Sequence, residues 1–132
     1  MEKLKILLID DDKDFCKVIK EVLARTGKYK ILVATGGEVG SILARCRWHK
    51  PHLILLDIMM SGLDGFELLK RFKKDKRTLY IPVIIVTGRT DLESKIRAEG
   101  LYCEDYLVKP FDSELLKSKI EDVLARHGIG HE

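Results

Sequence analysis

The chain has 132 residues, of which 45% are apolar and 34% are charged, and its formal net charge is +3. This length and balance predict one globular domain with a sizeable core and exclude a disordered chain. So small a positive charge does not indicate nucleic-acid binding, and no apolar run reaches the roughly 18 residues of a membrane span.

The N-terminal segment and the cysteines indicate the compartment. The segment MEKLKILLID lacks the apolar stretch and the small-residue cleavage site of a secretory signal peptide. The three cysteines, Cys16, Cys46 and Cys103, are odd in number and widely spaced, as expected of reduced thiols rather than of disulfides or a zinc site. We therefore expect a cytoplasmic protein without a membrane segment.

Apolar segments alternate with amphipathic ones along the whole chain. Short apolar runs predict strands over residues 4–9, 30–34, 52–56, 82–86 and 105–108. Apolar residues spaced three or four apart predict helices over residues 14–26, about 38–48, 64–74, about 91–99 and about 113–126. Gly27 ends the first helix, Pro51 blocks the second, and Asp112 or Ser113 can cap the last. Five strand–helix units predict an α/β fold, a doubly wound parallel sheet with helices on both faces.

Acidic residues follow two of the predicted strands. Asp57 ends the third strand within PHLILLDIMMSGLDG, and Asp10 and Asp11 end the first. The carboxyl ends of parallel strands share one edge, so neighbouring strands would bring these carboxylates together. Like charges that close need a cation among them, and carboxylate oxygens suit Mg²⁺. Lys109, after the last strand, and Thr87, after the fourth, could then bind phosphoryl oxygens.

Four segments, LLIDDD, LILLDIMMSGLDGFELL, VIIVTG and DYLVKPF, together resemble the receiver domain of two-component response regulators. They occur in the order and at the spacing of that family over about residues 5–126; each motif is weak evidence by itself, but the set is highly specific. The resemblance implies a receiver domain over residues 1–132 and a flavodoxin-like sheet with strand order 2-1-3-4-5.

The resemblance also implies how the acids act. Asp57 accepts a phosphoryl group from the phosphohistidine of a sensor histidine kinase or a phosphotransfer protein. Asp10, Asp11, Asp57 and the main-chain carbonyl of Met59 bind Mg²⁺, for which Mn²⁺ could substitute. Asp12 is not carried over as a ligand, and we expect it in the loop or as a cap of the first helix.

The remaining roles concern signalling. Lys109 pairs with Asp57 and then with the phosphoryl group, while the Thr87 hydroxyl turns towards a phosphoryl oxygen and Tyr106 fills the space it leaves. The output surface is helix four, strand five and helix five, which controls a downstream effector domain or protein and could form a homodimer. The domain would catalyse only its own phosphorylation and dephosphorylation and would not bind nucleic acid directly.

The sequence departs from the family pattern at three places. Met60-Ser61 stands where Met-Pro is usual, and serine in place of proline predicts a more mobile loop after Asp57. Tyr102 and Cys103 replace the usual Gly-Ala, so either Tyr102 takes a strained left-handed conformation or Gly100 ends helix four. Neither Met59 nor Arg89, at two positions that tune phosphoryl lifetime in the family, would orient a water, which predicts slow self-hydrolysis.

Two alternatives and one weaker feature stay open. An aspartate-nucleophile phosphohydrolase would need an acid two residues after Asp57, where Met59 stands. A degenerate receiver that only binds partners would lack some of the five site residues. The basic run over residues 70–77 has no interleaved aromatic residues and fits a solvated helix end better than a nucleic-acid patch. The sequence identifies neither the kinase nor the output, and it leaves open a stand-alone regulator or part of a longer one.

Overall fold

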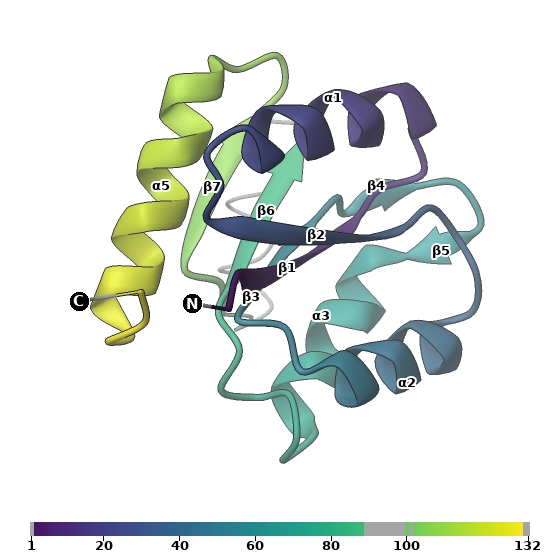
Figure 1. Cartoon of the computed structure of the whole chain (residues 1–132). Helices are drawn as coiled ribbons and strands as arrows, with labels where there is room; N and C mark the ends of the chain where they lie inside the picture. The colour runs from purple at the N-terminus through teal and green to yellow at the C-terminus, as the bar shows by residue number, and fades with distance from the viewer. Residues whose placement is uncertain (1, 89–99, 101, 131–132) are drawn as a thin grey trace.

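A computed structural model describes residues 2–88, 100 and 102–130 and contains one five-stranded parallel sheet (Figure 1). Its strands, in the order β2-β1-β3-β6-β7, span Tyr29–Ala34, Leu4–Ile9, Leu53–Leu56, Val83–Thr87 and Asp105–Val108. This confirms the predicted order 2-1-3-4-5, and each predicted strand boundary lies within one residue of the observed one.

Helices cover both faces of the sheet, as predicted. Figure 1 shows α1 and α5 on one face and α2 and α3 on the other, and these helices span Lys13–Ala24, Ser113–Arg126, Val39–His49 and Gly65–Lys74. The helix predicted over residues 91–99 and the predicted role of Arg89 fall outside the described residues. None of the described helices is long and apolar enough to cross a membrane.

Two apolar layers hold the sheet between its helices, because alternate residues of a strand point to opposite faces. In β1, Ile6 and Leu8 face α1 and α5, whereas Leu7 and Ile9 face α2 and α3. Every residue of the central strand β3 is buried, as expected of a parallel strand covered on both sides. The strand ends beyond these layers are left to carry polar side chains.

Aspartate side chains start three of the helices. The Asp12 carboxylate accepts a hydrogen bond from the Phe15 amide at 3.0 Å and so caps α1, as expected. Asp64 caps α3, and Asp112 rather than Ser113 caps α5. Each cap stands between a strand of the main sheet and the helix that follows it, at the carboxyl edge of the sheet, so helix starts and strand ends are fixed together.

A short hairpin after β3 was not predicted. Its strands β4 and β5, Met59–Met60 and Leu63–Asp64, pair antiparallel, so that Ser61 and Gly62 form the turn. Gly62 has a φ of 72°, which suits glycine at this place in a turn. At the base of the hairpin, a Cβ added to Gly65 would lie 2.6 Å from the Cα of Ile58. Only glycine therefore allows α3 to start this close to the strand.

Two conformations were expected for the segment before β7, a strained left-handed Tyr102 or a turn at Gly100, and the structure does not have the first. Among the described residues, Lys50 is the only non-glycine with a positive φ, so Tyr102 does not carry left-handed strain. Gly100 takes the left-handed conformation instead, with a φ of 69°. The wide φ range of glycine thus absorbs the turn that the bulkier Tyr102 would resist.

The single tryptophan, Trp48, lies in the last turn of α2 with 84% of its surface exposed. Because α2 runs back from the carboxyl end of β2 to the amino end of β3, its last turn lies at the opposite edge of the sheet from the strand ends that carry the acids (Figure 1).

Candidate functional site

Three carboxylates meet at the carboxyl edge of the sheet. Asp10 and Asp11 follow β1 and Asp57 follows β3, and one oxygen of each lies within 4.8 Å of an oxygen of the others. The strand register accounts for this, since Ile9 pairs with Leu56 and the Asp57 amide donates to the Ile9 carbonyl at 2.9 Å. Asp10 and Asp57 are buried, and Asp11 is the least buried of the three.

Main-chain amides orient each of these carboxylates. The Asp12 amide donates to Asp10 Oδ1 and the Met59 amide donates to Asp57 Oδ1, both at 2.9 Å and both from two residues further along the chain. The third amide, that of Ser61 in the hairpin turn, donates to Asp11 Oδ2 at 2.9 Å. Hydrogen bonds from neutral amides compensate buried carboxylates without adding charge, so the cluster keeps its negative character.

Lys109 links two of the acids. Its Nζ lies 2.6 Å from Asp10 Oδ2 and 3.3 Å from Asp57 Oδ2, and its amide donates to the Thr87 carbonyl at 2.8 Å. The pairing with Asp57 expected from the sequence is therefore present, but the shorter contact is to Asp10. Burial would lower the pKa of Lys109, but its hydrogen bond to Asp10 and the charges of both acids outweigh burial and raise the pKa.

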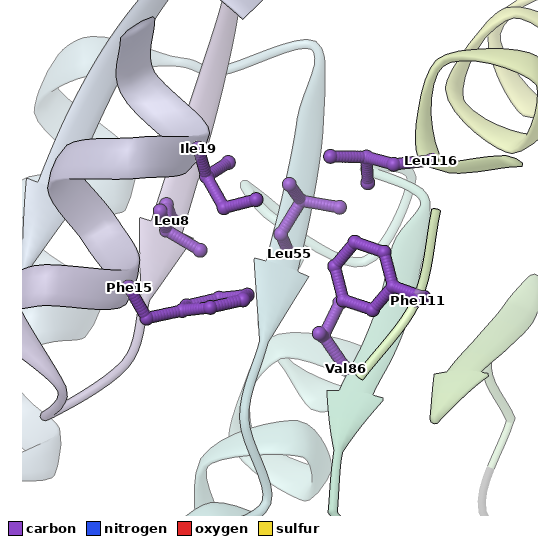
Figure 2. Close-up of a pocket in the computed structure, with 7 residues that line it drawn as sticks. All are labelled: Leu8, Phe15, Ile19, Leu55, Val86, Phe111 and Leu116. Atoms are coloured by element: carbon purple, nitrogen blue, oxygen red, sulfur yellow. The ribbon is translucent and has the colours of Figure 1, made fainter. Parts of the chain in front are cut away.

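Phe15, which sequence reasoning missed, supports this ammonium group. Lys109 Nζ lies 4.0 Å from the centroid of the Phe15 ring, within the range of a cation–π contact. Phe15 in turn meets the ring of Phe111 edge to face, with 5.9 Å between the ring centroids. Figure 2 shows these rings among the aliphatic side chains Leu8, Ile19, Leu55, Val86 and Leu116, which come from α1, the sheet and α5. The only sequence signal was an aromatic residue in the first turn after the acids.

The surroundings of Asp57 disfavour the ionised form of its carboxyl group. Burial raises the pKa of Asp57 above its ordinary value, and the nearby charge of Asp10 acts in the same direction. The Met59 amide and Lys109 oppose this, because both stabilise the ionised form, but the net shift is upward. The site therefore favours a further positive charge near this carboxylate.

Thr87 adds an unpaired hydroxyl. Its side chain is 2% exposed at the end of β6, and among the described residues its Oγ1 is the buried side-chain polar atom without a hydrogen-bond partner. A buried hydroxyl usually finds a partner, so an unpaired one points to a group that arrives later. Tyr106, in β7, is partly buried and packs on the α2 and α3 side of the sheet. Its predicted switch role stays a prediction.

The donor set fits the magnesium ion expected from the sequence. Three clustered carboxylates offer hard oxygen ligands. Two of these carboxylates, Asp10 and Asp57, are buried, and the Lys109 ammonium contacts both. The unpaired Thr87 hydroxyl adds a donor for an oxygen of a further ligand. The Met59 carbonyl, the fourth expected ligand, belongs to the first residue of β4, two residues after Asp57.

The basic run of residues 70–77 lies elsewhere, at the end of α3 and in the loop that follows. Part of it lines a groove of about 400 Å³ together with Leu43 and Arg47 of α2. Two of its cations are paired within the chain: Arg71 contacts Glu67 at 3.1 Å, and Arg77 contacts Asp75 at 3.4 Å. Arg47 of α2 also contacts Asp75, at 3.0 Å. These pairs fit the predicted solvated helix end.

Comparisons with known proteins agree with the geometry. Residues 6–121 match the model of the response regulator receiver domain. Protein PilH of Pseudomonas aeruginosa is 38% identical over 121 residues, which cover 92% of this chain and 98% of PilH. The phosphate regulon transcriptional regulatory protein PhoB of the same organism is 35% identical over 95% of this chain and 53% of PhoB.

Solved structures show the same fold. A CheY-like response regulator receiver domain protein from Methanospirillum hungatei superposes with a TM-score of 0.82 at 28% identity, covering 95% of this chain and 96% of that one. The chain spans about half the length of most of the curated relatives it matches, and nearly all of PilH. From this match and the acids at its sheet edge, the chain belongs to the family of response regulator receiver domains.

Proposed function

We propose that the chain is a phosphoacceptor that takes a phosphoryl group onto Asp57 in an Mg²⁺-dependent reaction. The donor would be the phosphohistidine of a sensor histidine kinase or of a phosphotransfer protein, acting in the cytoplasm. The observation that carries this proposal is one cation bridging two buried acids at the sheet edge where β6 ends in an unpaired hydroxyl: Lys109 contacts Asp10 and Asp57, and the Thr87 hydroxyl has no partner among the described residues.

In the proposed transfer, an Asp57 oxygen attacks the phosphorus, a P–O bond forms, and the P–N bond to the donor imidazole breaks. The leaving imidazole keeps the electron pair of that bond. Main-chain and side-chain contacts hold the nucleophile, because the Met59 amide occupies Oδ1 and the Lys109 ammonium approaches Oδ2 at 3.3 Å. Such transfers pass through a loose transition state, so positioning and charge neutralisation supply most of the catalysis.

Three groups would bind the metal besides Asp57 itself: Asp10, Asp11 and the carbonyl of Met59. When bound, Mg²⁺ would neutralise charge on the carboxylates and on the phosphoryl oxygens. The chain's own contribution is to hold Lys109 against Asp10 and Asp57, where Phe15 and the Asp10 carboxylate fix its ammonium. Lys109 would move its contact from Asp57 to a phosphoryl oxygen after transfer.

The signal would follow from the new charge. Phosphorylation adds about −1.5 to −2 charges at pH 7, and the Thr87 hydroxyl, at the end of the neighbouring strand β6, is an unpaired donor. Thr87 would turn inward, Tyr106 would follow, and the face of β7, α5 and the predicted helix over residues 91–99 would change. That face would control an effector domain or protein, or form a homodimer; relatives that are longer than this chain include transcriptional regulators. No nucleic-acid binding or turnover of other substrates is proposed.

The test uses beryllofluoride, which mimics a phosphoryl group on a carboxylate, together with Mg²⁺. Amide NMR spectra of the wild-type chain should change at Asp57, Thr87 and Tyr106, and those of Asp57→Asn should not. Equal responses of the two proteins, or none in either, would contradict the proposal. Sustained hydrolysis of an aryl phosphate would instead favour a phosphohydrolase.

A further inference from the structure

The carboxylate of Asp11 is anchored differently from its neighbours. Asp10 and Asp57 each receive an amide hydrogen bond from two residues further along the chain. Asp11 receives its bond from Ser61, a residue 50 positions away in the turn of the β4–β5 hairpin. This bond therefore ties the loop after β1 to the hairpin after β3.

The anchor leaves one oxygen of Asp11 available. Ser61 occupies Oδ2, and no described residue donates a hydrogen bond to Oδ1. Asp11 is the least buried of the three acids and lies in a loop, so packing restrains its side chain less than those of Asp10 and Asp57. Hydrogen bonds to a ligating carboxylate set its direction, and their loss typically weakens metal binding about 10–100-fold.

Building on the proposed function, we propose that the Ser61 main-chain amide is a positioning group for the metal site. It holds the Asp11 carboxylate where one of its oxygens lies within 4.8 Å of an oxygen of each of the other two acids. By the same bond, it couples capture of the divalent cation to the order of the hairpin that follows Asp57. A residue without an N–H at position 61 would break this coupling whatever its side chain.

The turn geometry makes this test specific. Ser61 is the first of the two turn residues between the paired Met60 and Leu63, and Gly62 after it has a positive φ. Proline is favoured at that first position of a type II turn, and Met60 before it is extended, which proline also accepts. Ser61→Pro therefore keeps the turn and removes the N–H, whereas Ser61→Ala removes the hydroxyl and keeps the N–H.

The first measurement is the Mg²⁺ dissociation constant of Ser61→Pro and Ser61→Ala, from titrations followed by amide NMR. We expect binding about tenfold weaker in Ser61→Pro than in Ser61→Ala. In an Asp11→Ala background, which lacks the acceptor, the same pair should differ by less than about twofold, because no bond is left to lose. If Ser61→Pro and Ser61→Ala bind Mg²⁺ with equal affinity in the chain that keeps Asp11, the inference is wrong.

The second measurement needs no metal. Hydrogen exchange of the Ser61 amide should be slow in the wild-type chain and at least about tenfold faster in Asp11→Ala, since the acceptor is lost. Asp14→Ala is the matched control, because it removes the same charge from an exposed residue in the first turn of α1. Unchanged exchange in Asp11→Ala would contradict the anchor.

The two measurements separate this inference from the proposed function. If the wild-type chain does not bind Mg²⁺ while Asp11→Ala speeds exchange at Ser61, the proposed metal-dependent function fails and the anchor stands, without a role in metal binding. If the wild-type chain binds Mg²⁺ and the two Ser61 variants bind it equally, the site stands and the coupling is wrong.

Discussion

At the scale of one residue, the unpaired hydroxyl of Thr87 shows how the proposed site lowers the stability of the folded state. A buried donor without a partner destabilises the folded state by about 1–3 kcal/mol, and Thr87 Oγ1 is such a donor among the described residues. Thr78 offers the opposite case, because it is also fully buried but donates to the Phe72 carbonyl at 2.8 Å. A buried threonine hydroxyl is thus hydrogen-bonded at Thr78, in the loop after α3, and unpaired at Thr87, at the proposed site.

We expect Thr87→Val to raise the free energy of unfolding by about 1 kcal/mol, because valine fills the same space without an unpaired hydroxyl. The variant should also lose much of its spectral response at Tyr106 to beryllofluoride with Mg²⁺. Urea denaturation and amide NMR measure the two effects.

Thr78→Val is the control for that change, and it should lower the free energy of unfolding by about 1–3 kcal/mol because it leaves a buried carbonyl without its donor. A loss of stability in both variants would show that the Thr87 hydroxyl is satisfied in solution.

Sequence reasoning reached these residues unevenly. It placed Asp10, Asp57, Thr87 and Lys109 at strand ends because each closes an apolar run, and the parallel sheet then brings such ends together. It missed Phe15, since a helix residue that supports a lysine 94 positions later has the same local pattern as a core residue. Contacts between segments that are distant in sequence leave no periodic trace within either segment.

At the scale of elements, the β4–β5 hairpin sets the path of the chain between Asp57 and α3. Strands of two residues are too short to give an alternating pattern, so the sequence predicted a loop after Asp57 but not a hairpin. Here the glycines explain the path of the main chain better than the apolar residues do. Gly65 starts α3 against the main chain of Ile58, where the nearest atoms to an added Cβ would be 2.6–2.9 Å away.

Gly65→Ala should therefore destabilise the chain by about 2 kcal/mol or more, because a main-chain neighbour cannot move aside as a side chain can. Shifting the start of α3 would also displace Asp57, so the response to beryllofluoride should weaken. Gly40→Ala is the matched control: Gly40 lies in α2 with no atom within 4 Å of an added Cβ.

The control substitution should stabilise the chain by about 0.5–1 kcal/mol through better helix propensity. Thermal unfolding of both variants gives the comparison, and a similar melting temperature for the two would refute the close approach at Gly65.

For the molecule as a whole, the site concentrates negative charge in a fold that is otherwise slightly basic. Burial keeps the pKa of Asp57 raised in the folded state, so the folded chain binds this proton more tightly than the unfolded chain does. The stability contributed by protonated Asp57 is present at low pH and is lost as the pH rises through the folded-state pKa. At neutral pH the ionised carboxylate therefore destabilises the fold.

Asp57→Asn should accordingly be more stable than the wild-type chain at pH 7, by about 1 kcal/mol. The difference should shrink as the pH falls towards and below the ordinary carboxyl pKa of 3.8, where both folded and unfolded wild-type chains are protonated. Urea denaturation at a series of pH values measures this. A wild-type chain that is the more stable of the two at pH 7 would show that Lys109 outweighs burial.

The position of Trp48 decides how the molecule can be observed. As the sole indole, exposed in the last turn of α2 at the opposite sheet edge from the acids, it should emit as a hydrated ring. Events at the carboxyl edge should leave that emission almost unchanged. An indole introduced at Met59, whose side chain is 47% exposed beside Asp57, would supply an optical reporter once Trp48 is replaced by phenylalanine.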